Sequence, residues 1–110
     1  MSPITTHVLD TARGLPAQGV PVELEFRDAQ GWKSLAKGKT DADGRIANLL
    51  KGKLAKGFYR LHFNTAAYFR SIGTKGFYPT VLVTFQIREK RHHHVPLLLS
   101  PYGYSTYRGS

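Results

Sequence analysis

The segment His94-Val-Pro-Leu-Leu-Leu-Ser-Pro-Tyr-Gly-Tyr-Ser-Thr-Tyr-Arg-Gly-Ser110 carries the pattern that decides the fold. Its first half alternates between an apolar set and a more mixed set, which is typical of a strand with one buried face. The set expected to face the core is Val95, Leu97 and Leu99. Ser100-Pro101 predicts a turn, and a second strand-like alternation continues to Ser110. The segment therefore predicts a β-hairpin that stays patterned to its last residue, where a chain usually frays.

The same period of two recurs along the chain, with turn residues about every 8–12 positions. Further strands are predicted over 20–27, 59–63 and 81–87, and turns over 28–31 and 40–44. Gly44 can supply the positive φ that the second of these turns needs. The segment 65–73 predicts a short helix, with Thr65 as its N-cap and Gly73 just past its C-terminus. Together these elements predict an all-β sandwich of seven or eight short strands in two sheets.

The composition is that of a small globular protein. At 110 residues the chain is expected to form a single domain, residues 1–110, and 41% of its residues are hydrophobic. The absence of Cys excludes disulfides and thiolate metal sites. No apolar run approaches the ~18 residues of a membrane span, and residues 1–7 lack the basic and apolar regions of a secretory signal. We therefore expect a cytoplasmic protein with no membrane partner.

The chain is strongly basic, which raises the question of a nucleic-acid partner. Its formal net charge is +9 and its pI is about 10.1. The basic residues are nevertheless scattered, and the one dense stretch, 88–91, contains Glu89. Since no DNA- or RNA-binding motif is evident, we expect no nucleic-acid partner and relate the charge to solubility or to the attraction of small anions.

The side chains available for chemistry are mainly imidazoles. The sequence has no Cys nucleophile and no Gly-rich phosphate loop, and no close carboxylate pair is expected, with Glu23 and Glu25 predicted on the solvent side of a strand. The five histidines are His7, His62, His92, His93 and His94. Imidazole titrates near neutrality and is the usual general base. His62 is expected to cap or pack, and two histidines that project the same way, 92 and 94, make a weak metal site without a third ligand.

Strand parity assigns faces to the remaining candidates. With Ser100-Pro101 as a two-residue connection, the predicted cross-strand pairs are His94 with Tyr107, Pro96 with Ser105 and Leu98 with Gly103. The face away from the core would then display His94, Ser105, Tyr107 and Gly109. Pro96 indicates that its strand is not central in a fully bonded ladder. In the N-terminal strand, His7 lies opposite the apolar set, but the sequence does not place it beside His94.

Three blocks of the chain resemble the transthyretin superfamily. They are Thr6-His-Val-Leu-Asp10 with Gly14-Leu-Pro-Ala17, then Thr40-Asp-Ala-Asp-Gly-Arg45, and the segment from His94 to Ser110. The Tyr-Arg-Gly-Ser ending and the His and Arg at these positions are similar to the 5-hydroxyisourate hydrolase branch, because the thyroid-hormone carriers lack them. One departure is His93, where the family commonly has Tyr; by parity it points away from His94, so little effect is expected.

The resemblance implies a transthyretin-like sandwich of two four-stranded sheets with one short helix. It further implies dimers joined through edge strands and a homotetramer, a dimer of dimers, with the sites in a central channel. The residues carried over are His7, Arg45 and His94 as the catalytic set, and His7, Arg45, Tyr107 and Ser110 as substrate contacts. No metal and no organic cofactor is implied.

The activity implied is hydrolysis of 5-hydroxyisourate to 2-oxo-4-hydroxy-4-carboxy-5-ureidoimidazoline in urate catabolism. One neutral His would take a proton from water, and Arg45 would stabilise the charge that develops on the ring carbonyl oxygen. The sequence does not say whether His7 or His94 is the base. The alternatives are a non-enzymatic carrier of a flat aromatic ligand in the same channel and a basic module that binds polyanions.

Overall fold

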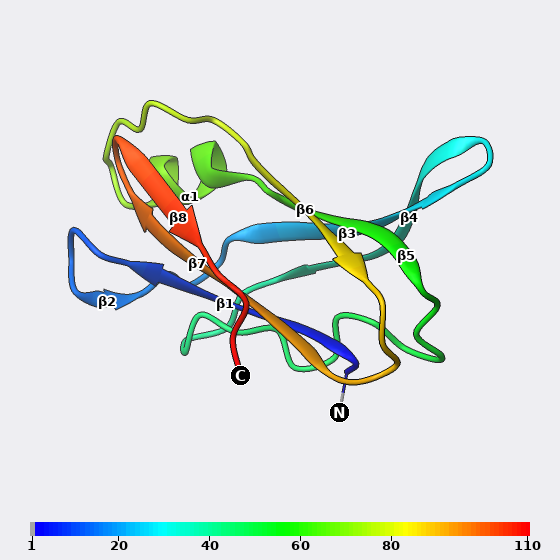
Figure 1. Ribbon diagram of the computed structural model, residues 1–110. Coiled ribbons are helices and arrows are strands. Elements are labelled where there is room, and N and C mark those ends of the chain that lie inside the picture. Colours follow the sequence, from blue (N-terminus) through cyan, green and yellow to red (C-terminus); the bar gives the residue numbers. More distant parts are fainter. Residues whose placement is uncertain (1) are drawn as a thin grey trace.

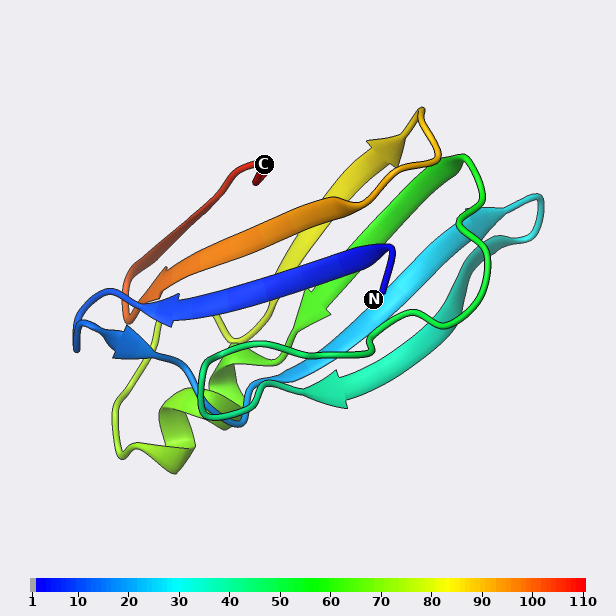
Figure 2. The same cartoon turned by 90° about the horizontal axis from the view of Figure 1, so that it is seen from below.

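The computed structural model describes residues 2–110, which form two four-stranded sheets packed face to face. The elements in chain order are β1 (Ile4–Asp10), β2 (Leu15–Pro16), β3 (Pro21–Asp28), β4 (Gly31–Lys39), β5 (Gly57–Phe63), α1 (Thr65–Ser71), β6 (Val81–Ile87), β7 (His93–Ser100) and β8 (Gly103–Thr106). The strand order is β2-β1-β7-β8 in one sheet and β4-β3-β5-β6 in the other. Figure 1 labels these elements, and Figure 2 shows the two sheets as separate layers with α1 at one end. The predicted two-sheet sandwich with one short helix is confirmed.

Alternating burial along the strands builds the core between the sheets. In β1 every second residue from Ile4 is buried, and β5 buries Tyr59, Leu61 and Phe63 in the same way. Leu61 in β5 and Leu97 in β7, one from each sheet, have no exposed surface. A fully buried Leu contributes about 1.5–3 kcal/mol relative to an exposed one. The core faces predicted from the period of two are therefore correct.

The short helix begins one residue earlier than the sequence predicted. Asn64, not Thr65, is the N-cap, since its side-chain oxygen accepts a hydrogen bond from the Ala67 amide. Thr65 is instead fully buried, and its hydroxyl donates to the carbonyl of Tyr78. Gly73 adopts φ +68° just beyond the helix, as predicted. The buried position of Thr65 depends on the 77–80 segment, which local sequence does not reveal.

The C-terminal hairpin forms as predicted, but its register differs by two residues. Ser100 pairs with Gly103 and Leu98 with Ser105, so the two-residue loop is Pro101-Tyr102 rather than Ser100-Pro101. The physical reason is that Ser100 still belongs to the strand, where its hydroxyl donates to the Gly103 carbonyl. Consequently Gly109, and not Tyr107, lies opposite His94. A shift of two keeps every side chain on its predicted face.

Pro96 lies in an inner strand, at the point where pairing on one side has ended. β7 runs between β1 and β8, but β8 pairs only with residues 97–100. The Pro96 carbonyl faces the β8 side, where it accepts from the Thr106 hydroxyl at 2.6 Å. Its nitrogen points the same way, so the missing N–H leaves no gap in the β1 ladder. This agrees with the expectation that the strand is not central in a fully bonded ladder.

The only helix within residues 2–110 is α1, and its seven residues are far too few to cross a bilayer.

Candidate active site

Parallel pairing of β1 with β7 brings two of the predicted site histidines onto one face. In the register, Thr5 lies beside His94 and His7 beside Pro96. Residues 5 and 7 alternate with the buried positions of β1, and His94 lies next to buried Val95 in β7. All three side chains therefore project from the outer face of the same sheet. The sequence could not relate His7 to His94, and this pairing of β1 with β7 puts both on one face, two register positions apart.

Arg45 reaches the same face through the turn over 40–44. The Asp41 carboxylate accepts hydrogen bonds from the amides of Asp43 and Arg45, at 2.9 and 3.0 Å. Gly44 adopts φ +76°, and its carbonyl accepts from the Val8 amide at 2.8 Å. These bonds fasten the turn to β1 and leave Arg45 bridged by backbone to His7. The hydrogen bonds within the Thr-Asp-Ala-Asp-Gly-Arg motif thus position Arg45 beside β1.

The hydrogen bond of His7 fixes which of its nitrogens is free. His7 Nε2 lies 2.8 Å from the backbone carbonyl oxygen of Asp43. A carbonyl can only accept, so Nε2 carries the hydrogen and donates it. Nδ1 is therefore the nitrogen of His7 that remains for a ligand.

His94 is half-buried and electrostatically disposed to stay neutral. Burial is the main cause that lowers its pKa below the ordinary value of 6.5, and the positive charges of Arg45, His7 and His92 act in the same direction. An interaction with the Thr5 backbone acts in the opposite direction and raises the pKa. The Thr5 side chain contacts the same ring, with Oγ1 2.8 Å from Nδ1. At neutral pH the imidazole is consequently unprotonated, as a general base must be.

The C-terminal tail completes a cavity over His94. The Gly109 amide donates to the His94 carbonyl at 2.8 Å, which lays residues 107–110 along the outer edge of β7. The resulting cavity has a volume of about 270 Å³. Its lining is Thr5, Thr6, Arg45, Ile46, His92, His94 and Ser110. Three of the five predicted site residues, Arg45, His94 and Ser110, therefore line one cavity.

The other two predicted residues lie next to this cavity rather than in it. His7 lines an adjoining depression with Leu9, Pro16 and Asp43, and Arg45 belongs to both hollows. Tyr107 is exposed and lines a separate cavity of about 250 Å³ against β6, to which His94 also contributes. His94 thus lines both the cavity that contains Ser110 and the one that contains Tyr107.

Four residues of the cavity were not among the predicted site residues: Thr5, Thr6, Ile46 and His92. Two of them, Thr5 and His92, lie against His94. Thr5 Oγ1 contacts both His94 and His92, whose Nε2 lies 2.8 Å away. Parity supplied a signal for each, because Thr5 shares the face of His7, and His92 shares the face of His94.

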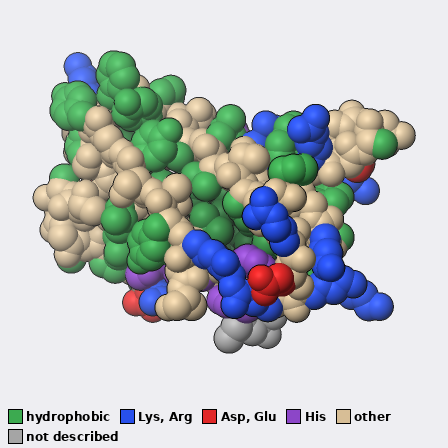
Figure 3. Space-filling view, viewed as in Figure 1, with side chains coloured by type: hydrophobic (Ala, Val, Ile, Leu, Met, Phe, Trp, Pro, Cys, Tyr) green, Lys and Arg blue, Asp and Glu red, His purple; other side chains and the backbone are tan. Residues whose placement is uncertain are grey.

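The Arg45 guanidinium is open to a ligand. Arg45 is exposed, and neither of the two ion pairs found within residues 2–110 involves it. Figure 3 shows histidine side chains beside Lys and Arg side chains in the lower part of the molecule, near the C-terminus marked in Figure 1. An unpaired guanidinium with a planar fork is suited to a planar, oxygen-rich molecule.

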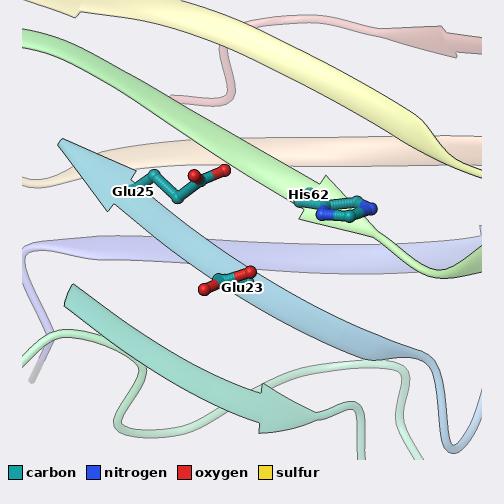
Figure 4. A group of neighbouring side chains, drawn as sticks. All are labelled: Glu23, Glu25 and His62. Atoms are coloured by element: carbon teal, nitrogen blue, oxygen red, sulfur yellow. The ribbon is translucent and has the colours of Figure 1, made fainter. Parts of the chain in front are cut away.

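A second polar group lies on the outer face of the other sheet, where no close carboxylates were expected. One ligand atom each from Glu23, Glu25 and His62 lies within 4.8 Å of the others (Figure 4). The prediction that no close carboxylate pair exists was therefore wrong, and His62 joins this group instead of simply capping or packing. The pairing of β3 with β5, which sets Glu23 beside His62, brings them together.

This group has the donor types of a metal site, but one of its carboxylates is already paired with Arg60. Both oxygens of Glu25 accept from Arg60, at 3.0 and 3.1 Å, and this interaction lowers the pKa of Glu25. Lys37 is the β4 register partner of Glu23. A cation here would compete with Arg60 for Glu25, so the outer face of the β1–β7 sheet is the stronger candidate for the active site.

Comparison with known proteins identifies the family of the chain. The model of the HIUase/Transthyretin family matches residues 4–109. The chain belongs to this family. A 5-hydroxyisourate hydrolase of Mus musculus is 50% identical over 99% of the chain and 96% of its own length. One from Caulobacter vibrioides is 48% identical over the full length of both chains.

Solved structures of both hydrolases and transthyretins share the fold of this chain. The structure of Klebsiella pneumoniae 5-hydroxyisourate hydrolase is 40% identical and superposes with a TM-score of 0.89 over the whole of both chains. Transthyretin from Sparus aurata, 34% identical, superposes with a TM-score of 0.92 over 99% of this chain and 97% of its own. Since both branches share the fold, the fold alone does not distinguish them. The high identity to proteins named as hydrolases does, and it confirms the expected resemblance: this member of the HIUase/Transthyretin family is an enzyme of the hydrolase class.

Proposed function

We propose that this protein hydrolyses 5-hydroxyisourate to 2-oxo-4-hydroxy-4-carboxy-5-ureidoimidazoline in the degradation of urate. The observation that carries the proposal is the convergence of His7, Arg45 and His94, far apart in the sequence, on one face of one sheet. Relatives that match the whole chain and are named 5-hydroxyisourate hydrolase support the choice of substrate.

In this proposal His94 is the general base. Its Nδ1 is engaged by Thr5, so Nε2 is the nitrogen that faces a substrate in the cavity. Because its lowered pKa keeps the ring neutral at pH 7, Nε2 takes a proton from water as the oxygen attacks the ring amide carbonyl. A positioned base of this kind contributes about 10²–10⁴-fold to the rate.

Arg45 and His7 act on the other side of the reacting carbonyl. The Arg45 guanidinium stabilises the negative charge that develops on the carbonyl oxygen, without being neutralised by a carboxylate of the described residues. His7, held by its bond to Asp43, presents Nδ1 toward the substrate beside Arg45. Ser110 at the mouth of the cavity and Tyr107 in the adjoining one contact and orient the ring.

The proposed assembly is a homotetramer in which two dimers enclose a channel. β6 and β8 each form one edge of their sheets. Large hydrophobic side chains on or beside these two strands are exposed, among them Phe77, Leu82, Tyr102 and Tyr104. Figure 3 shows hydrophobic side chains gathered on the side of the molecule where β8 lies. Such edges and patches are suited to pairing with a second copy. Sedimentation that returns the monomer mass would contradict this assembly.

A coupled assay tests the activity. Urate oxidase generates 5-hydroxyisourate from urate, and its absorbance is followed with and without the protein. Accelerated loss of the absorbance is the expected result. Saturable ligand binding without acceleration would instead identify a carrier of a flat aromatic molecule, like the thyroxine-bound sea bream transthyretin that this chain resembles in fold.

Replacing Arg45 with lysine should lower kcat/KM by about tenfold, because an ammonium keeps the charge but not the planar fork. Steady-state kinetics in the coupled assay measures the effect. Arg70→Lys on α1 is the matched control, since the same change there lies outside the site, and it should leave kcat/KM unchanged. Equal rates for both variants would remove Arg45 from the mechanism.

Replacing Gly109 with alanine should lower kcat by about tenfold with little loss of stability. A Cβ at this position would lie 2.6 Å from His94 Cδ2, so the imidazole must move, and small displacements of a reacting group are costly. Gly103→Ala is the control, because its Cβ meets only Ser100 Oγ at an ordinary 3.7 Å. If both variants turn over at the wild-type rate, His94 is not the reacting imidazole.

A further inference from the structure

The hydroxyl of Thr5 lies between two imidazoles at the wall of the cavity. Its Oγ1 is 2.8 Å from Nε2 of His92 and 2.8 Å from Nδ1 of His94. The two rings are stacked, with centroids 6.4 Å apart and planes inclined by 19°. Thr5 is the register partner of His94, so the contact is set by the pairing of β1 with β7 rather than by a loose surface side chain.

The Thr5 hydroxyl has one hydrogen to donate and two imidazole nitrogens within hydrogen-bond distance. Among the described residues, Thr5 Oγ1 has these two nitrogens as its side-chain partners. A hydroxyl donates one hydrogen and accepts with its lone pairs, so it donates to one imidazole and accepts from the other. If it donates to His92, then His94 carries its hydrogen on Nδ1 and has a free lone pair on Nε2. If it donates to His94, the hydrogen of neutral His94 is on Nε2, which then cannot take a proton.

We propose that Thr5 and His92 are positioning residues that hold His94 in the Nδ1–H tautomer, the only neutral form that can act as a base through Nε2. The inference rests on the proposed role of His94 and adds to it the device that sets its tautomer. A group that orients an imidazole in this way is a familiar requirement wherever histidine acts as a base.

Other charged groups face the pair, but they act differently. Arg45 from the turn after β4 and His7 from β1 are the cationic groups that, with His92, lower the pKa of His94, and Ser110 of the tail lines the same cavity. Their charges change how strongly His94 binds a proton. They do not contact Thr5 Oγ1, so they do not decide the direction in which its hydroxyl points.

Paired substitutions at Thr5 test the proposal. Thr5→Val keeps the shape and removes the hydroxyl, and we expect kcat to fall at least about tenfold. Thr5→Ser restores the hydroxyl and should recover most of that loss. Nitrogen NMR of histidine-labelled protein, assigned with single-histidine variants, should show the Nδ1–H tautomer of His94 in the wild type and in Thr5→Ser, and loss of that preference in Thr5→Val. An unchanged tautomer in Thr5→Val would overturn the proposal.

Replacing His92 with phenylalanine tests the other half of the proposal. Phe keeps a ring beside His94 and removes both nitrogens, so the Thr5 hydroxyl loses His92 Nε2 as a partner and is free to donate to His94 Nδ1. We expect the Nδ1–H preference of His94 to be lost in the nitrogen NMR spectrum and kcat to fall. An unchanged tautomer and an unchanged kcat in His92→Phe would overturn the positioning role of His92.

Failure of this inference is distinguishable from failure of the proposed function. If His94→Ala retains wild-type turnover, His94 is not the base and the proposed mechanism is wrong. If His94→Ala is inactive while Thr5→Val and Thr5→Ser are equally active, the mechanism stands and the positioning role of Thr5 is wrong.

Discussion

Replacing His94 with alanine is expected to lower kcat by at least about 10²-fold while the fold remains intact. The physical reason is the loss of the neutral imidazole that lines the cavity together with Arg45 and serves as the base in the proposed mechanism. The side chain is half-buried on the outer face of its sheet and lies outside the hydrophobic core, so its truncation removes little packing. The coupled assay measures kcat, and thermal unfolding at a fixed protein concentration verifies the fold.

The matched control for this substitution is His62→Ala, which removes an imidazole from the outer face of the opposite sheet. It should keep wild-type kcat. His7→Ala is expected to be impaired as well, because His7 lies beside Arg45 on the β1–β7 face. Wild-type turnover in both His7→Ala and His94→Ala would show that the chemistry occurs elsewhere.

Replacing Gly44 with alanine is expected to lower the free energy of unfolding by about 2–4 kcal/mol. Two costs add. Gly44 adopts φ +76°, which is unfavourable for a residue with a Cβ, and the added Cβ would clash with the backbone carbonyl oxygen of Val8. Because the Gly44 carbonyl also accepts from the Val8 amide, the turn that carries Arg45 must move away from β1. Activity should fall together with stability.

Gly19→Ala isolates the first cost, the positive φ, and its difference from Gly44→Ala gives the second. Gly19 has a similar φ of +80°, but its Cβ would meet nothing within 4 Å. The variant therefore carries the backbone strain without the clash and should lose about 1–2 kcal/mol. Denaturant or thermal unfolding of both variants, at one protein concentration, gives the difference. Equal destabilisation would mean that the contact between the turn and β1 is unimportant.

Local sequence patterns predicted the faces of the strands but not the partners across them. The alternation of Val95, Leu97 and Leu99 identified the buried face of β7 correctly. The hairpin register was wrong by two residues because Ser100, a good turn former, is held in the strand by its own hydroxyl. Since a shift of two preserves parity, the error changed the neighbour of His94 and not its direction.

The contacts that the sequence could not predict are those between elements distant along the chain. Glu23 and His62 belong to strands that local reasoning could not pair, so the Glu23–Glu25–His62 group was missed. The parallel alignment of β1 with β7 joins Thr5 to His94 over a separation of 89 residues, and no local signal encodes it. The Thr40–Arg45 turn, by contrast, was recognisable because its hydrogen bonds lie within the motif.

That parallel pairing also has a consequence for synthesis on the ribosome. The segment that becomes β1 emerges early, whereas its neighbour β7 is translated near the end of the sequence. The β3-β4 and β5-β6 contacts involve nearer segments and can form while β1 still waits for a neighbour. His7 and His94 come onto one face only when this inner strand is inserted, so in the proposed mechanism the site forms late in folding. Until then the nascent chain exposes an uncovered sheet edge, which is the stage at which a chaperone would have most to protect.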